Sequence, residues 1–210
     1  MRPVVFDCDG VLVDTEDIWS SSLHVVLTRM GGADLGSRSL AMRGGSVPEA
    51  ASLLERESGV TVDVDAFGAE VYRLVLAGIA QGVRAMPGAI ELIESLGRSR
   101  TLAVASNGSH ETVFASLASA GIPDVFDAIV ALDGVLRPKP APDLYLRACV
   151  LLGVETKSTV AIEDSWRGAT AAKAAGMFVV GVGNVDVFDA VADLVVANLF
   201  DPELAALLDL

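Results

Sequence analysis

The sequence predicts an α/β fold with a parallel sheet and one inserted helical segment. Short apolar runs alternate with helix-like segments over the second half of the chain, which is typical of strands joined by crossover helices. The first such run is instead followed, at 15–84, by helical periodicity without a convincing strand. A chain of 210 residues, 52% of them hydrophobic, can bury a core of this size.

Six short apolar, β-branched runs are predicted to be buried parallel strands. Because they alternate with helical segments, the sheet is expected to be joined by crossover connections. The runs are VVFDC (4–8), TLAVAS (101–106), DAIVAL (127–132), STVAIED (158–164), FVVGVG (178–183) and DLVVAN (193–198).

Helices are predicted between the later strands, at 110–121, 141–153 and 165–176. Each of these segments ends at a glycine, the residue expected just past the last helical turn. Ser165 is placed to begin the last of them.

The segment after the first strand is predicted to be helical throughout. The α/β pattern resumes where Pro87 and Gly88 punctuate the chain. We therefore predict an α/β core and one helical insertion. The helices of the insertion are expected within 17–31, 47–59 and 64–82, the core comprises 1–14 and 85–210, and the insertion comprises 15–84.

Composition argues against several classes of protein. A formal net charge of -13 disfavours nucleic acids and anionic membranes as partners, since both require a basic face. No apolar run approaches the roughly 18 residues that span a membrane, and no secretory signal is expected before the strand-like run at Pro3. Cys8 and Cys149 are far apart in the sequence and are expected to be reduced thiols in a cytoplasmic protein. The protein is expected to be a monomer.

Two aspartates follow the first strand, at the end of a sheet where ligands bind in open α/β folds. Asp7 and Asp9 are separated by one residue and followed by a glycine. Two carboxylates this close need a reason to ionise together, and a divalent cation is the usual one. A carboxylate can also attack phosphorus. The alternative is an acidic turn without a chemical role.

The second strand is followed by S-N-G-S at 106–109. The hydroxyl of Ser106 and successive backbone N–H groups at a strand-to-helix turn form a natural pocket for an oxyanion. Ser109 alternatively only caps the following helix.

A third motif, R-P-K-P-A-P-D, presents Lys139 between prolines that hold the loop stiff and extended. The chain has only three lysines, so a rigidly held cation suggests a function. The alternative is an exposed basic loop.

A fourth motif places Glu163 and Asp164 at the end of an apolar strand. The alternative to a functional role is an acidic helix start, favoured by the helix dipole. Together the four motifs predict a magnesium-dependent phosphoryl-transfer site, because Mg²⁺ prefers hard oxygen ligands and Lys139 would face the phosphoryl group.

The order of the motifs resembles the haloacid dehalogenase-like hydrolase superfamily over essentially the whole chain. The residues that carry the resemblance are D-x-D-G at 7–10, S-N-G at 106–108, K-P at 139–140 and E-D at 163–164. The extended pattern is similar to the branch of sugar-phosphate phosphatases and β-phosphoglucomutase-like proteins. The resemblance implies a Rossmann-like core with an α-helical cap as the insertion.

The resemblance also implies a role for each motif residue. Asp7 would be the nucleophile that forms an aspartyl-phosphate, and Asp9 the general acid and then the general base. Phosphoryl oxygens would be held by Ser106, Asn107, Gly108 and Lys139. Magnesium would be bound by Asp7, Glu163, Asp164 and the backbone carbonyl of Asp9.

Side chains of the insertion are expected to contact the rest of the substrate. The candidates are Thr15, Glu16, Trp19 and Arg43. The sugar mutases of the family carry a histidine where Trp19 stands and an arginine where Val47 stands, although Arg43 could substitute. These departures favour a phosphatase acting on a singly phosphorylated sugar, sugar acid or polyol over a β-phosphoglucomutase-type mutase.

Two further alternatives fit the sequence less well. A dehalogenase would need neither Asp9 nor a metal. A receiver-like module, which binds phosphate and metal without being an enzyme, has its acidic pair before the phosphoacceptor and no long helical insertion.

Overall fold

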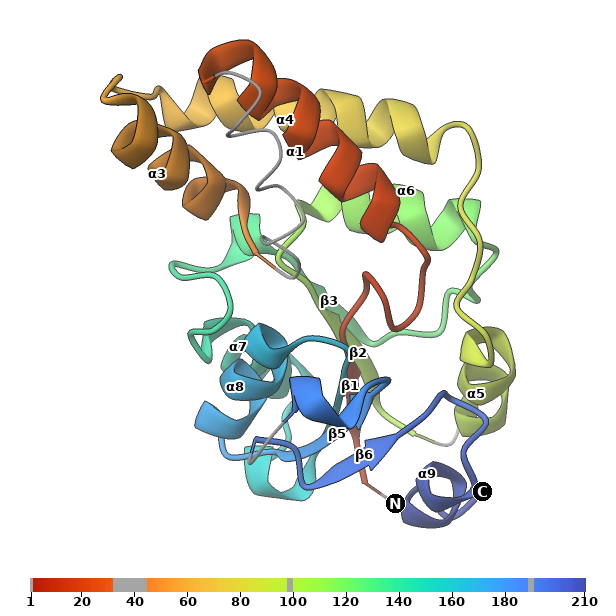
Figure 1. Ribbon diagram of the computed structural model, residues 1–210. Helices are drawn as coiled ribbons and strands as arrows, with labels where there is room; N and C mark the ends of the chain where they lie inside the picture. Colours follow the sequence, from red (N-terminus) through yellow and green to blue (C-terminus); the bar gives the residue numbers. More distant parts are fainter. Residues whose placement is uncertain (1, 32–44, 98–99, 189–190) are drawn as a thin grey trace.

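The computed structural model describes residues 2–31, 45–97, 100–188 and 191–210 (Figure 1). A parallel sheet lies between layers of helices, and three further helices form a group beyond one end of the sheet. In chain order, the strands and helices are β1 (Val4–Phe6), α1 (Glu16–Gly31), α3 (Val47–Ser58), α4 (Val64–Ile79), α5 (Ala89–Leu96), β2 (Leu102–Ala105), α6 (His110–Ser119), β3 (Ala128–Val130), α7 (Asp143–Leu152), β4 (Val160–Glu163), α8 (Trp166–Ala174), β5 (Phe178–Val182), β6 (Leu194–Val196) and α9 (Pro202–Leu207). Short 3₁₀ helices lie at Leu132–Gly134, Thr156–Ser158 and Val185–Val187.

All six predicted strands form one parallel sheet, in the order β3-β2-β1-β4-β5-β6, which confirms the predicted fold class. β1 lies at the centre, where Val5 pairs with Ala103 of β2 and Ala161 of β4. The loops that follow β1, β2 and β4 therefore meet at one edge of the sheet. The predicted runs extend beyond the strands at this edge, because there the chain turns into the loops of the candidate site.

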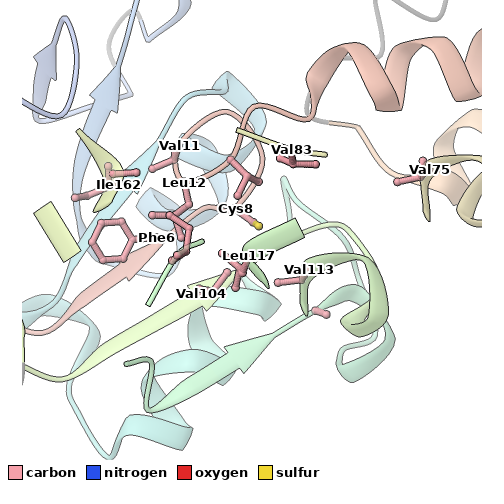
Figure 2. Packing of buried hydrophobic residues seen from close by; sticks show 14 of the residues in the cluster. Phe6, Cys8, Val11, Leu12, Val75, Val83, Val104, Val113, Leu117 and Ile162 are labelled. Carbon is pink, nitrogen blue, oxygen red and sulfur yellow. The ribbon is translucent and has the colours of Figure 1, made fainter. Parts of the chain in front are cut away.

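Alternate strand residues pack against opposite helical layers. Phe6 and Val104 share a cluster with Leu117 of α6 (Figure 2). Residues of α5 and α9 belong to the same cluster. Val5 points the other way and shares a cluster with Tyr145 of α7 and with residues of α8. Because helices cover both faces, the strands read as continuous apolar runs.

The helices α1, α3 and α4 lie between β1 and α5 in the sequence. They pack on one another. A Cβ on Gly78 of α4 would lie 2.6 Å from Cγ2 of Ile18 of α1, so the glycine permits the close crossing of these helices. α4 also packs on α6 of the sheet layers. The division into core and cap, with boundaries near residues 15 and 84, stays a prediction.

Several predicted helix ends are confirmed. The side chains of Ser109 and Ser165 accept hydrogen bonds from backbone amides of the first turns of α6 and α8. Gly153 ends α7 in the left-handed conformation. α9 was not predicted, although Asp201 caps it and Pro202 opens it, which are both recognised helix-start signals.

Both cysteines are free thiols, as predicted, and both are buried. Within the described ranges, no helix is long and apolar enough to cross a lipid bilayer. The cytoplasmic location and the monomeric state stay predictions.

Candidate active site

Asp7 lies directly after β1, at the centre of the sheet edge. Its backbone amide donates to the carbonyl of Ile162 at 2.9 Å, which continues the pairing with β4. Its side chain is almost fully buried, and Oδ1 accepts hydrogen bonds from the Cys8 amide and from Nζ of Lys139, each at 2.8 Å. The carboxylate is thus fixed in orientation by one backbone donor and one cation.

Lys139 reaches this edge from the loop before α7. Its ammonium is buried and donates to Asp7 at 2.8 Å and to Oε1 of Glu163 at 2.6 Å. Its backbone amide donates to Oδ1 of Asn107 at 2.9 Å, which ties the lysine loop to the S-N-G turn. Direct contacts therefore bring all four motifs together, since Asp7, Asn107, Lys139 and Glu163 each come from a different one.

The charges of this buried group do not balance. Burial raises the pKa of Asp7 well above its usual value, the Glu163 carboxylate adds to this, and Lys139 offsets only part of it. Burial would lower the pKa of Lys139, but the carboxylates of Asp7 and Glu163 outweigh it and raise that pKa. The lysine therefore stays protonated beside one carboxylate more than it can neutralise.

Asp7, Glu163 and Asp164 form a cluster that could hold a metal ion, with one oxygen from each within 4.8 Å of the others. Three carboxylates with an excess of negative charge fit Mg²⁺, a hard cation that binds oxygen ligands. The Asp9 carboxylate is not part of this cluster, and the role of the Asp9 backbone carbonyl as a ligand, which the resemblance implies, stays a prediction.

Gly10 permits the close approach of the Asp164 carboxylate to the loop after β1. Its φ of +84° lies in the left-handed region. A Cβ at this position would also lie 2.1 Å from Oδ2 of Asp164. The glycine of D-x-D-G is therefore required both for the turn and for the packing of an acidic side chain against it.

The Asp9 carboxylate turns toward the insertion and receives three donors. Thr15 donates its hydroxyl to Oδ1 at 2.5 Å, and Trp19 donates Nε1 to the same oxygen at 2.9 Å. The hydroxyl of Ser106 donates to Oδ2 at 3.2 Å. Thr15 and Trp19 therefore hold the side chain that is expected to be the general acid, and their contact with substrate stays a prediction.

The S-N-G turn lies beside Asp9. The amide of Ser106 donates to the carbonyl of Val130 at 2.9 Å, so the turn begins where β2 and β3 separate. The amide of Gly108 donates to the Ser106 hydroxyl at 2.9 Å. The turn thus gathers a hydroxyl and a backbone donor within reach of Asp9, and its phosphate-binding role stays a prediction.

A small chamber of about 60 Å³ joins the core motifs to the insertion. The predicted residues Glu16 and Trp19 line it, whereas Arg43 lies outside the described residues. On the core side the chamber is lined by Asp7, Asp9, Asn107, Gly108, Lys139, Asp164 and Ser165, and on the insertion side by Glu16, Trp19, Ser20, Leu23, Gly45, Ser46 and Val47.

An ion pair joins the insertion to the core beside this chamber. Nη1 of Arg167 in α8 lies 2.5 Å from Oε1 of Glu49 in α3. The other oxygen of Glu49 accepts the backbone amide of Ser46 at 2.9 Å, and Ser46 lines the chamber. This pair was not predicted, because nothing in the local sequence brings residues 49 and 167 together.

Comparison with known proteins identifies the family. Residues 4–182 match the family described as haloacid dehalogenase-like hydrolase. The chain belongs to this family. The resemblance inferred from the four motifs is thereby confirmed.

Three similar proteins illustrate the relationship. The chain is 33% identical over 181 residues to a bifunctional riboflavin kinase/FMN phosphatase of Arabidopsis thaliana, covering 85% of this chain but 48% of that protein. It is 30% identical over 179 residues to the fructose-1-phosphate phosphatase YqaB of Escherichia coli (strain K12), covering 85% and 95%. The crystal structure of CbbY from Rhodobacter sphaeroides in complex with phosphate superposes with a TM-score of 0.84, at 28% identity and full coverage of both chains.

Two of these relatives are named as phosphatases. These two names and the family match agree with the prediction that this chain is a phosphoric monoester hydrolase. The chain spans about half of the plant relative, so that protein's full activity does not transfer to it.

Proposed function

We propose that the protein is a Mg²⁺-dependent phosphatase that hydrolyses a small phosphorylated sugar, sugar acid or polyol through an aspartyl-phosphate. The contact of the buried Lys139 ammonium with the Asp7 carboxylate at 2.8 Å carries this proposal, because Glu163 and Asp164 lie beside it. The similarity to the fructose-1-phosphate phosphatase YqaB supports the substrate class.

In the first step, Asp7 acts as the nucleophile. Lys139 and the Cys8 amide both bind Oδ1, which leaves Oδ2 to attack the phosphorus atom. An Asp7–phosphorus bond forms as the bond from phosphorus to the leaving oxygen breaks. Phosphoryl oxygens are held by the Ser106 hydroxyl, the backbone amides of Asn107 and Gly108, and Lys139, so positioning and charge stabilisation supply most of the rate.

Asp9 serves both chemical steps. When protonated, it donates its proton to the departing oxygen, and it then takes a proton from the water that attacks the aspartyl-phosphate. This attack restores the Asp7 carboxylate and releases inorganic phosphate. For both transfers the carboxylate must exchange its contacts with Thr15 and Trp19 for contacts with substrate or water.

A magnesium ion would be held by Asp7, Asp164, Glu163 and the backbone carbonyl of Asp9. When bound, the ion neutralises phosphoryl charge and offsets the excess carboxylate of the cluster.

The chamber favours hydrolysis over mutase chemistry. Val47 lines it where the sugar mutases are expected to carry an arginine, and Trp19 donates to the Asp9 carboxylate where they are expected to carry a histidine. Leu23 adds another apolar side chain on the insertion side. Membership of a hydrolase family argues against the receiver-like alternative.

The test is phosphate release from a panel of phosphorylated metabolites, with Mg²⁺ and with EDTA. We expect release from one substrate class that depends on Mg²⁺ and is lost in Asp7→Asn. Conversion of a sugar 1-phosphate to its 6-phosphate with a bisphosphate primer, without net phosphate release, would establish the mutase instead. Activity retained in Asp7→Asn would refute the assigned nucleophile.

A further inference from the structure

The Glu163 carboxylate is fully buried and contacted from three sides. Its Oε1 accepts Nζ of Lys139 at 2.6 Å and the hydroxyl of Tyr145 at 2.5 Å. Its Oε2 accepts the hydroxyl of Ser165 at 3.1 Å. A buried carboxylate requires such donors, so each contact helps to fix where the carboxylate lies.

Tyr145 comes from α7, whose helical layer covers the face of the sheet opposite α6, and it is completely buried. Its ring also faces the lysine, with Nζ of Lys139 5.1 Å from the ring centroid. The hydroxyl donates its bond to Glu163 from a position enclosed by protein on all sides. One side chain therefore contacts both members of the Lys139–Glu163 pair.

Gly168 provides the space in which the carboxylate lies. A Cβ on this residue of α8 would be 1.7 Å from Oε1 of Glu163 and 2.1 Å from Oε2. Glycine inside a helix is less favourable than alanine by about 1 kcal/mol, so its presence here is not explained by helix formation. The carboxylate occupies the volume that any other side chain at 168 would need.

We propose that Tyr145 and Gly168 are positioning residues, which fix Glu163 so that it holds the Lys139 ammonium against Asp7. The hydroxyl of Tyr145, on α7, orients the Glu163 carboxylate by a hydrogen bond, and the absence of a side chain at Gly168, on α8, leaves space for that carboxylate. Among the described residues, neither of the two lines the chamber, so both act through Glu163 and Lys139. This inference rests on the proposed phosphatase function, because it concerns the orientation of the proposed nucleophile.

The decisive variant is Tyr145→Phe, which removes one hydroxyl and keeps the ring against Lys139. A hydrogen bond to a buried charge is strong enough that kcat is expected to fall about tenfold or more when it is lost. KM is expected to change less than about threefold, because a misplaced nucleophile affects the transition state more than substrate binding. The Mg²⁺ affinity measured by calorimetry is expected to change less than the turnover rate.

The chain offers a matched control, since Tyr72 is its other tyrosine. Tyr72→Phe removes the same hydroxyl in the insertion and is expected to leave kcat and KM unchanged. Gly168→Ala should lower kcat as Tyr145→Phe does, if its thermal unfolding remains cooperative. Should that variant fail to fold, Glu163→Gln replaces it in a double-mutant cycle with Tyr145→Phe.

In that cycle, Tyr145→Phe is expected to add little to Glu163→Gln, because both act on one carboxylate. Additive losses, or a Tyr145→Phe variant with wild-type kcat, would overturn the inference. Phosphate release by the wild type and by Tyr72→Phe separates this result from failure of the proposed function. If the wild type releases no phosphate, it is the proposed function that fails; if the wild type releases phosphate and Tyr145→Phe does so at the wild-type rate, only the positioning role fails.

Discussion

Replacing Lys139 by methionine should destabilise the protein far more than replacing Asp7 by asparagine. Lys139→Met keeps most of the length of the side chain and removes the cation shared by two buried carboxylates. Only 3% of the Lys139 side chain is exposed, and none of Glu163. The perturbation therefore leaves like charges facing each other away from water.

Removing one partner of a buried ion pair costs about 3–5 kcal/mol. Lys139 pairs with two carboxylates, at 2.8 Å and 2.6 Å, so the upper part of this range is expected at neutral pH. This is a large fraction of the roughly 5–15 kcal/mol that stabilises a typical domain.

Asp7→Asn should be neutral or stabilising in the absence of divalent metal. The pKa of Asp7 is raised in the folded protein, chiefly by burial and then by Glu163, so the folded state holds its proton more strongly than the unfolded chain. The stability that this proton supplies is complete below the unfolded pKa and is lost as pH rises through the folded pKa. Asp7→Asn has no such titrating proton and does not lose this stability, so the difference in unfolding free energy between the variant and the wild type should grow with pH.

Urea denaturation in EDTA at acidic, neutral and mildly alkaline pH would measure both effects. Lys139→Met should lower the unfolding midpoint without changing the denaturant slope, and Asp7→Asn should raise the midpoint or leave it unchanged. If the free energy of unfolding of Lys139→Met lay within about 1 kcal/mol of the wild-type value, removal of the lysine would leave no uncompensated buried charge. That result would refute this reasoning.

Three further variants test other contacts. Gly10→Ala would place an alanine at a strained φ, with its Cβ 2.1 Å from a carboxylate oxygen of Asp164. The Mg²⁺ affinity measured by calorimetry should therefore fall at least about tenfold. An unchanged affinity would contradict the close approach of Asp164 to this turn. Trp19→Phe removes the 2.9 Å hydrogen bond from Nε1 to Asp9, so kcat should fall about threefold to tenfold at similar KM. An unchanged kcat would mean that Asp9 is positioned without this hydrogen bond. Arg167→Gln breaks the ion pair with Glu49. Because both side chains are about one-third exposed, the pair contributes at most about 1 kcal/mol, so KM should rise by up to about fivefold. If the difference in KM between variant and wild type did not shrink at high salt, an electrostatic origin would be contradicted.

Local sequence patterns determined much of the fold. Continuous apolar runs predicted each of the six strands, because both faces of the sheet are covered by helices. Ser109, Ser165 and Gly153 marked helix ends correctly, since capping depends on residues within one turn. The proximity of Asp7 and Glu163 was also predictable, because parallel strands bring their carboxyl ends to one edge.

Tertiary structure alone decided how these side chains are held. No local pattern indicated that Trp19 would bind Asp9, that Tyr145 would bind Glu163, or that Arg167 would pair with residue 49. In the sequence, Tyr145 is indistinguishable from any other apolar position of a core helix. Such contacts depend on the rotation of each helix and the path of each loop. Those are set by packing between segments far apart in the chain, whereas the periodicity of one segment specifies only which of its faces is buried.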